Sequence, residues 1–249
     1  MAKQVIVTGS SGIAAVLIRA LDARGDAIYI VGGIDSESQS LKDECKNVKG
    51  FSSIDLRDEA QVVASFQLAA KTLGKVSDVV GIVGGSGRKF GDGKVEDISL
   101  DAWDRTLALN LSSAFLTLRE GVKLLKESGG SITLTSSVLA TSPVQEHFTT
   151  HAYATSKAGL EGMVRVAATS YLSEKIRINA VAPGLVDTPM AKRAGEDPVI
   201  QKFTAQKQPL AGGQLPATAL TSAYLYLIDN QYVTGEVLTV DGGWRSMAN

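Results

Sequence analysis

Residues 4–15 have the sequence QVIVTGSSGIAA, and this stretch decides the fold. The apolar run Val5–Val7 predicts a short buried strand. Residues 12–23 carry apolar side chains at helical spacing, which predicts a helix with one buried face. Between them lie Gly9 and Gly12, and glycine permits a tight turn because it has no Cβ. A strand that passes through a glycine turn directly into a helix is typical of the first part of a βαβ unit.

The same alternation continues along the rest of the chain. Strands are predicted at residues 27–31, 48–54, 76–83, 131–135, 176–181 and 237–240, and helices at residues 36–46, 59–73, 100–126 and 153–172. Strands separated by helices favour an α/β fold, with about seven parallel strands between two helical layers. We therefore expect a Rossmann-like doubly wound sheet in a three-layer α/β/α domain that spans residues 1–249. Residues 184–215 resist assignment because they contain several prolines.

The glycine turn also indicates a class of ligand. A helix that begins just after a strand offers free N–H groups and the positive end of its dipole to an anion. Glycine lets a pyrophosphate approach the backbone, and Ser10 and Ser11 add hydroxyl donors. The turn therefore predicts a dinucleotide site that comprises Thr8, Gly9, Ser10, Ser11, Gly12 and Ile13. Other strand-to-helix turns look similar, so this prediction depends on the motifs that follow.

Tyr153 and Lys157 lie four residues apart in a predicted helix and therefore share one face. A cation beside a phenol favours the phenolate, so we expect Lys157 to lower the pKa of Tyr153. A tyrosine tuned in this way can exchange a proton with a substrate near neutral pH. Taken alone, the pair is also compatible with a solvated helix face that has no function.

The composition excludes several classes of function. The 249 residues include 25 Lys and Arg and 26 Asp and Glu, a net charge of −1 that favours neither nucleic acid nor an anionic membrane as partner. Cys45 is the only cysteine, which suits a reducing compartment, and no clustered set of His, Cys, Asp and Glu indicates a metal site. The sequence shows no leader pattern and no apolar stretch of membrane-spanning length. We expect a soluble, cytoplasmic protein without a metal.

Several further motifs follow the glycine turn in a fixed order. They are Asp55 in Ile54–Leu56, Asn110 in Leu109–Leu111, Ser137 at the end of residues 134–137, the Tyr153 and Lys157 pair, residues 179–184 (NAVAPG) with Thr188, residues 234–236 (TGE) and residues 240–243 (VDGG). In this order they resemble the short-chain dehydrogenase/reductase family, in its compact single-domain form, over nearly the whole chain. The resemblance implies an oxidoreductase that uses a nicotinamide dinucleotide.

The resemblance assigns four residues to catalysis, which are Asn110, Ser137, Tyr153 and Lys157. It implies that Tyr153 exchanges the proton and that Ser137 helps to hold the substrate oxygen. Lys157 would hold the nicotinamide ribose and stabilise the tyrosinate, and Asn110 would hold a water that links Lys157 to solvent. Ser136 is the alternative to Ser137, since alternation along a strand sends the two side chains to opposite faces. Asn110 is alternatively a structural residue at a bend in its helix.

The resemblance also implies further cofactor contacts. They lie at Gly33, Asp35, Asp55, Leu56, Gly84, Gly85, Tyr153, Lys157, Pro183, Gly184, Val186 and Thr188. Asp55 alternatively only begins a turn. An acidic residue at the end of the second strand selects NAD(H), and an Arg there selects NADP(H). Gly32 and Gly33 occupy these positions, and Asp35 and Glu37 follow them. We therefore expect NAD(H) to be favoured over NADP(H), because Asp35 disfavours the 2′-phosphate.

The loop between Ser137 and Tyr153 is longer than is usual in the family and contains both histidines, His147 and His151. Each histidine is either a plain surface residue or a substrate contact, and contact would favour a polar or ionised group. By resemblance, an apolar wall of the substrate pocket comprises Leu139, Leu185, Met190 and Phe203. We expect residues 185–213 to form a substrate-binding flap over the strand ends.

The sequence thus favours hydride transfer between a nicotinamide and a carbonyl or secondary alcohol, as in a ketoreductase or alcohol dehydrogenase, with Tyr153 as general acid/base. A ring-diol or polyol dehydrogenase of the same family is an alternative. A catalytically weak dinucleotide-binding regulator is another, because two motifs depart from the family pattern. Residues 14–15 are alanines near the place of the third glycine, and residues 82–83 (IV) replace two asparagines. The resemblance also implies a homotetramer or homodimer.

Overall fold

The computed structural model describes residues 2–142, 144 and 147–247. Within these residues, seven strands form one parallel sheet in the order β3-β2-β1-β4-β5-β6-β7. The strands are β1 (Gln4–Thr8), β2 (Ala27–Gly32), β3 (Val48–Ser53), β4 (Asp78–Gly81), β5 (Gly130–Thr135), β6 (Ile176–Pro183) and β7 (Val237–Val240). This order confirms the predicted Rossmann-like doubly wound sheet.

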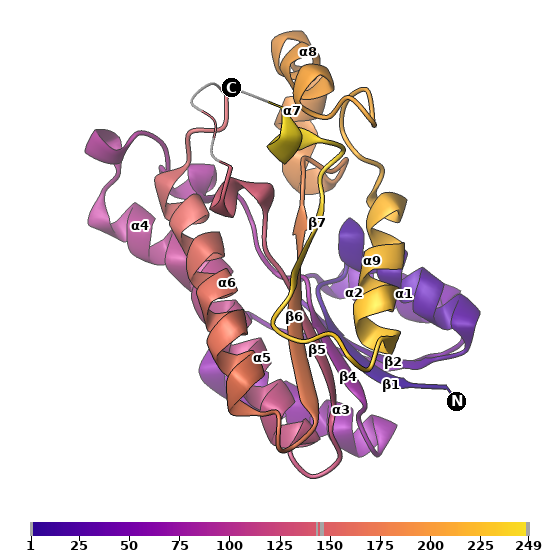
Figure 1. Ribbon diagram of the computed structural model, residues 1–249. Coiled ribbons are helices and arrows are strands. Elements are labelled where there is room, and N and C mark those ends of the chain that lie inside the picture. The colour runs from indigo at the N-terminus through magenta and orange to yellow at the C-terminus, as the bar shows by residue number, and fades with distance from the viewer. Residues whose placement is uncertain (1, 143, 145–146, 248–249) are drawn as a thin grey trace.

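Helices cover both faces of the sheet (Figure 1). One face is covered by α3 (Glu59–Leu73), α5 (Ser113–Leu125) and α6 (His151–Ser170), and the other by α1 (Ile13–Arg24), α2 (Asp35–Glu44) and α9 (Thr221–Asp229). Helix α4 (Leu100–Leu107) leads into α5, while α7 (Lys192–Glu196) and α8 (Pro198–Lys207) lie beyond the C-terminal ends of β6 and β7. No helix within the described residues is both long and apolar enough to span a bilayer.

Each face of the sheet has its own apolar core. Ile6, Val79 and Ile132 pack toward α3, α5 and α6. Val5 and Val80 pack on the opposite face, toward α1 and α9. Neighbouring residues of a strand point to opposite faces. A parallel sheet that is covered on both sides therefore needs apolar residues at nearly every central position, which explains the continuous apolar runs in these strands.

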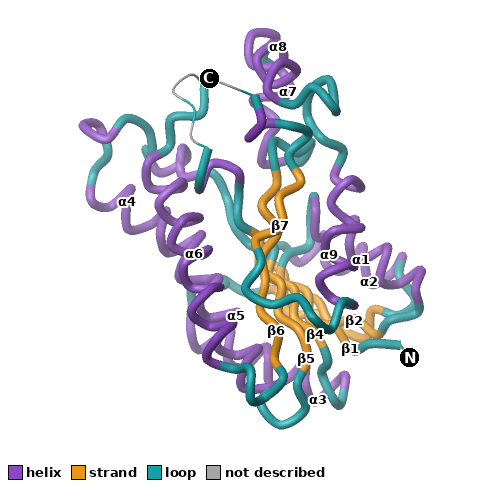
Figure 2. The backbone as a smooth tube through the Cα atoms, in the orientation of Figure 1, coloured by secondary structure: helices purple, strands orange, loops and turns teal. Residues whose placement is uncertain are grey.

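The strand order places a crevice at one edge of the sheet. β1 pairs with β2 on one side and with β4 on the other. The chain therefore winds outward from β1 in one direction and, after β4, in the other. At such a switch point the connections leave the C-terminal ends of the two strands in opposite directions, and ligands bind between them. Figure 2 shows the loops that gather at this edge, below α7 and α8.

The helix predicted at residues 100–126 is interrupted. α4 ends at Leu107, Ala108–Ser112 form a turn of π-helix, and α5 begins at Ser113. A π-turn adds one residue to a helical turn and often occurs at functional sites. The spacing of apolar residues did not predict this π-turn, because one extra residue in a helical turn leaves the apolar residues on a similar face of the helix.

Residues 184–215 contain two helices that the sequence left unassigned. Asp197 caps α8 by accepting hydrogen bonds from the N–H groups of Val199 and Ile200, and Pro198 opens its first turn. Helix α7 comprises only Lys192–Glu196. These helices are short and rich in polar residues, so the apolar spacing that marks longer helices is weak in them.

Candidate active site

A cleft of about 1070 Å³ opens at the C-terminal edge of the sheet. The glycine turn after β1 forms one wall, and residues that follow β4, β5 and β6 form the floor. All residues predicted to catalyse or to bind the cofactor line this cleft, except Thr8, Asp35 and Asn110. The tertiary structure therefore brings motifs from the whole length of the chain into one site.

The backbone of the glycine turn requires glycine at two positions. Gly9 has φ +108° and Gly12 has φ +53°, values that side-chain-bearing residues rarely adopt. A Cβ on Gly12 would lie 2.9 Å from Cγ2 of Thr188, which lines the cleft from the segment after β6. Gly12 is also the N-cap of α1, and no described side chain caps that end of the helix. A bare helix N-terminus beside a narrow gap fits the pyrophosphate of a dinucleotide.

In the first turn of α2, which follows β2, Glu37 rather than Asp35 reaches the cleft. The carboxylate of Glu37 accepts a hydrogen bond of 3.0 Å from the hydroxyl of Ser10 and lines the cleft. Asp35 lies in the first turn of α2 and is not part of the lining. Gly32 makes this approach possible, because a Cβ there would collide with the side chain of Ser38 and lie 3.0 Å from Oγ of Ser10. The carboxylate predicted for this position was that of Asp35, two residues earlier, and the structure places Glu37 there instead.

Three of the predicted cofactor contacts differ in exposure. Asp55 lines the cleft after β3, and Oδ2 of Asp55 forms an ion pair of 2.6 Å with Arg57. The hydrogen bond from Arg57 lowers the pKa of Asp55. Leu56 also lines the cleft and is largely buried. Thr8 is fully buried and lies outside the lining.

Lys157 lies on α6 and points into the floor of the cleft. Only 3% of its surface is exposed, and its Nζ donates a hydrogen bond of 2.8 Å to the main-chain oxygen of Thr135. Burial lowers the pKa of Lys157 to about 8, because the charged form loses hydration. The side chain can therefore gain or lose a proton close to neutral pH.

Tyr153 lies one helical turn before Lys157, whose Nζ is 5.7 Å from the centroid of the tyrosine ring. Burial raises the pKa of Tyr153, and a hydrogen bond with the hydroxyl of Ser137 acts in the opposite direction. Loss of hydration therefore outweighs the contact with Ser137 in setting the pKa of Tyr153, and the contribution of Lys157 to this pKa stays a prediction. The alternative hydroxyl, that of Ser136, donates instead to the carboxylate of Glu161 at 2.8 Å.

Asn110 lies in the π-turn between α4 and α5 and is fully buried. Its Oδ1 accepts a hydrogen bond of 2.9 Å from the N–H of Gly85, and its Nδ2 donates bonds of 3.0 Å to the oxygens of Gly85 and Thr106. The amide thus fixes the main chain after β4. A Cβ on the adjacent Gly84 would lie 3.2 Å from Nζ of Lys157. The water relay through Asn110 stays a prediction.

The six residues predicted for the substrate pocket divide into two groups. Leu139, Leu185 and Met190 line the cleft, whereas His147, His151 and Phe203 do not. The ring of Phe203 packs edge-on against Trp244, with 6.0 Å between centroids, and the ring of His147 packs against Phe203 at 5.3 Å. Nδ1 of His151 forms a hydrogen bond of 2.7 Å with the main-chain oxygen of Gly93.

Several residues that line the cleft were not predicted from the sequence. They are Arg88, Lys89, Phe90, Arg105, Phe148, Arg193 and Trp244. These residues come from loops and short helices after different strands, and no spacing along the chain relates them. For Glu37 a signal did exist, because its position in the first turn of a helix after β2 keeps it near the glycine turn.

The fold and the cleft define a dinucleotide-binding α/β protein, and comparisons with known proteins specify its family. The family described as enoyl-(acyl carrier protein) reductase matches residues 7–245. The chain is 32% identical to carbonyl reductase family member 4 of Danio rerio, with 96% of each chain covered. It is 30% identical to cis-4-hydroxycyclohexanecarboxylate dehydrogenase of Sinomonas cyclohexanicum, with 97% of this chain and 96% of the relative covered.

A solved structure shares the fold. A short-chain type dehydrogenase/reductase from Mycobacterium ulcerans superposes with a TM-score of 0.89 at 24% identity, over 98% of this chain and 91% of that one. The chain belongs to the short-chain dehydrogenase/reductase family, as its motifs predicted. It is an NAD(P)-dependent oxidoreductase that acts on CH–OH or C=O groups.

Proposed function

We propose that this protein transfers a hydride between a nicotinamide dinucleotide and a carbonyl or secondary alcohol, with Tyr153 as general acid/base. The observation that supports this most is the arrangement of three side chains in one cleft. Ser137 and Tyr153 line the same cleft, the hydroxyl of Ser137 opposes the rise in the pKa of Tyr153, and the buried Lys157 lies beside the tyrosine ring. The bound dinucleotide would supply or accept the hydride.

In this proposal each residue has a distinct task. The raised pKa keeps Tyr153 protonated at neutral pH, so its hydroxyl can donate a proton to a substrate oxygen that gains charge. Ser137 donates a second hydrogen bond to that oxygen and keeps it in reach of Tyr153. The charge of Lys157 stabilises the tyrosinate that remains. Asn110 fixes Gly84 and Gly85, which form the floor beside Lys157. Alcohol oxidation follows the same proton path in reverse.

A Tyr153→Phe variant tests this function. We expect the rate of NAD(P)H-linked turnover, measured with a panel of ketones and secondary alcohols, to fall by about 100-fold or more because the proton donor is lost. NADH binding, measured by calorimetry, should remain. A variant that keeps the wild-type rate would contradict the role of Tyr153. A wild type that binds NADH but turns over no carbonyl or alcohol would instead favour the dinucleotide-binding regulator.

For the cofactor, the proposal favours NAD(H) over NADP(H). Glu37 supports this, because its carboxylate stands beside the glycine turn, where a 2′-phosphate would meet a like charge. Glu37→Gln removes the charge and keeps the size, and we expect it to tighten NADPH binding about tenfold relative to NADH binding. Asp35→Asn is the matched control, since Asp35 lies outside the lining, and it should leave the ratio of dissociation constants unchanged. An unchanged ratio in Glu37→Gln would contradict the assignment.

The flap belongs to the same proposal. Leu185, Val186, Thr188 and Met190 line the cleft from residues 185–213, which also contain α7 and α8. We expect this segment to close over bound substrate and exclude water. Amide hydrogen exchange in residues 185–213 should slow when NADH and a product alcohol are added. Equal exchange with and without ligands would contradict a flap.

For assembly, the proposal is a homotetramer or homodimer. Phe115 on α5 is 46% exposed and Val166 on α6 is 68% exposed, although both are large apolar side chains. Exposed apolar residues on neighbouring helices are typical of surfaces that associate. Light scattering should report a dimer or tetramer, and a monomeric mass would contradict this part of the proposal.

The ring-diol or polyol dehydrogenase remains the alternative within the family. Its substrates carry two adjacent hydroxyls, so wild-type enzyme would oxidise cyclic cis-diols faster than the matched mono-alcohols. The rates of NAD(P)H-linked turnover with cyclic cis-diols and with the matched mono-alcohols separate this function from the ketone reductase or alcohol dehydrogenase.

A further inference from the structure

Arg88 and Arg193 meet at one main-chain oxygen on the substrate side of the cleft. Nη2 of Arg88 donates a hydrogen bond of 2.7 Å to the oxygen of His147, and Nη2 of Arg193 donates one of 3.1 Å to the same atom. Arg88 follows β4 and Arg193 lies on α7, so the fold brings the two guanidinium groups together from distant parts of the chain. Both residues line the cleft that contains Tyr153.

The two arginines have no acidic partner among the described residues. No carboxylate of those residues lies within ion-pair distance of either guanidinium group. Asp92 is close to Arg88, but its carboxylate already accepts hydrogen bonds from the N–H groups of Ala152 and Tyr153. Partial loss of hydration and the neighbouring Arg193 lower the pKa of Arg88, although its side chain stays exposed. Like charges that the fold holds side by side favour the binding of an anion.

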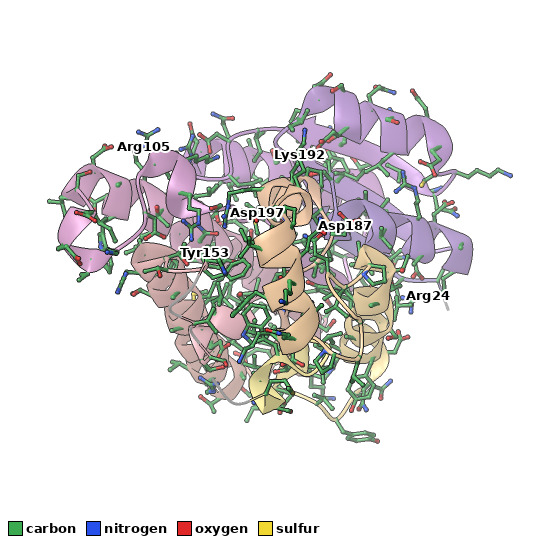
Figure 3. All side chains as sticks on the ribbon, turned by 90° about the horizontal axis from the view of Figure 1, so that it is seen from above. Arg24, Arg105, Tyr153, Asp187, Lys192 and Asp197 are labelled. Carbon is green, nitrogen blue, oxygen red and sulfur yellow. The ribbon has the colours of Figure 1, made fainter. Side chains whose placement is uncertain are left out.

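The carboxylates of the described lining gather at one end of the cleft, together with one cation, Arg57, which pairs with Asp55. Among the described lining residues the carboxylates are Glu37 and Asp55, and both lie at the end next to β2 and β3. Beyond the catalytic lysine, the charged lining residues at the other end are all cationic, namely Arg88, Lys89, Arg105 and Arg193. In the view of Figure 3, Tyr153 lies between α4, which bears Arg105, and α7, which bears Lys192. The substrate end of the cleft is therefore positive.

Each guanidinium group keeps donors for a ligand. Arginine has five N–H donors in a planar fork that matches a carboxylate. The bonds to His147 and Thr149 use only one nitrogen of Arg88, and the bond to His147 uses one nitrogen of Arg193. The segment that carries Arg88 is also fixed, since a Cβ on Gly87 would lie 2.6 Å from the side chain of Thr106.

The geometry points to an anion subsite in which Arg88 and Arg193 bind the carboxylate of a keto acid or hydroxy acid whose reacting oxygen lies at Tyr153. The inference rests on the proposed function and narrows its substrate class. Leu139 and Met190 line the cleft as well and offer an apolar surface to the carbon skeleton between the two ends. A phosphate monoester carries the same kind of anionic oxygen, and the test therefore includes both sources.

The first experiment compares substrates that differ only in charge. Wild-type enzyme is assayed with 4-oxocyclohexanecarboxylate and with its methyl ester, using NADH and NADPH. Because charge-assisted hydrogen bonds are lost with the ester, we expect kcat/KM for the acid to be about 10- to 100-fold higher. Turnover of the ester at an equal or higher kcat/KM overturns the carboxylate subsite and leaves the proposed function intact. No turnover of any ketone contradicts the proposed function instead.

Variants then assign the effect to the two arginines. Arg88→Met and Arg193→Met should each lower kcat/KM for the acid about tenfold more than kcat/KM for the ester, and so remove most of the preference for the acid. Lys192→Met is the matched control, because Lys192 is a neighbouring cation on α7 that pairs with Glu196 and lies outside the lining. If the arginines only hold residues 147–149, their loss lowers kcat/KM for acid and ester by the same factor, which overturns the inference. Two separate variants guard against one that fails to fold.

A binding measurement does not depend on turnover. Calorimetry with the NADH complex compares cyclohexanecarboxylate, cyclohexanecarboxamide and cyclohexyl phosphate as probes. The inference expects the carboxylate to bind at least about tenfold more tightly than the amide, and the difference to disappear in Arg88→Met and Arg193→Met. Tighter binding of the phosphate than of the carboxylate would identify a phosphate ester as the source of the anion and overturn the choice of a carboxylate. Equal binding of carboxylate and amide overturns the subsite altogether.

Discussion

The carboxylate of Asp92 caps the helix that carries Tyr153. It accepts hydrogen bonds from the N–H groups of Ala152 at 3.0 Å and Tyr153 at 2.9 Å, although Asp92 lies 61 positions before Tyr153 in the chain. Thr150, the N-cap residue of α6, makes no side-chain capping bond. A loop after β4 therefore fixes the start of the helix that presents both Tyr153 and Lys157.

Removal of this cap should weaken the fold and the site together. We expect Asp92→Ala to lower the free energy of unfolding by about 0.5–2 kcal/mol, the usual effect of a lost helix cap. We also expect kcat to fall more than KM rises, because Tyr153 loses its fixed position. Asp92→Asn keeps a capping oxygen and should restore most of both properties. If Asp92→Ala and Asp92→Asn lose kcat equally, the charge of Asp92 and not the cap is what matters. Urea unfolding and steady-state rates measure the two effects.

The two adjacent serines should have separable roles. Ser137→Ala should lower kcat by about 100-fold or more, because a donor to the substrate oxygen is lost. Ser136→Ala should instead lower the free energy of unfolding by about 1–3 kcal/mol, because the buried carboxylate of Glu161 loses the hydroxyl that donates to it. Rate and urea unfolding are measured on both variants. A larger loss of kcat in Ser136→Ala would reverse the assignment.

Lys157 should reveal its lowered pKa in the pH dependence of stability. Its pKa is about 8 in the folded protein and 10.5 in the unfolded reference. Between these values the unfolded chain binds more protons, so the free energy of unfolding contributed by this group rises with pH across that window. We expect the free energy of unfolding of wild type, relative to Lys157→Met, to increase by about 2 to 3 kcal/mol between about pH 7 and about pH 10. Groups that titrate in both proteins cancel in this difference, and a flat difference would contradict the shift.

The glycine turn should tolerate no side chain at Gly12. An alanine there would adopt φ +53° and place its Cβ 2.9 Å from Cγ2 of Thr188. We expect Gly12→Ala to weaken NADH binding by about tenfold or more, measured by calorimetry, because the gap to Thr188 closes. Gly25→Ala is the control, since Gly25 has φ +84° but open space around its Cβ position. It should cost stability at similar backbone strain and leave NADH binding unchanged. Equal loss of binding in both would assign the effect to strain alone.

Much of the fold was predictable because local chemistry specifies it. The helix predicted at residues 59–73 has those bounds in the structure, where Asp58 caps its start and Gly74 ends it. The strands were predictable because residues covered on both faces form continuous apolar runs. The π-turn at Ala108–Ser112 and the short helices α7 and α8 were not, because packing against other elements decides them.

The cytoplasmic location stays a prediction from composition, because nothing in the fold distinguishes one compartment from another. The homologous family and the α/β fold, in contrast, could be predicted from the order of the motifs and are confirmed.

The sequence by itself determined the parallel sheet, the glycine turn and the order of the catalytic motifs, because each depends on residues close together in the chain. Only the tertiary structure decided that Glu37 meets Ser10, that Asp92 caps the helix of Tyr153, and that Arg88 joins Arg193. These contacts join residues that follow different strands, and a parallel sheet collects the carboxyl ends of its strands at one edge. The spacing of residues along the chain therefore does not predict which side chains meet at that edge of the sheet.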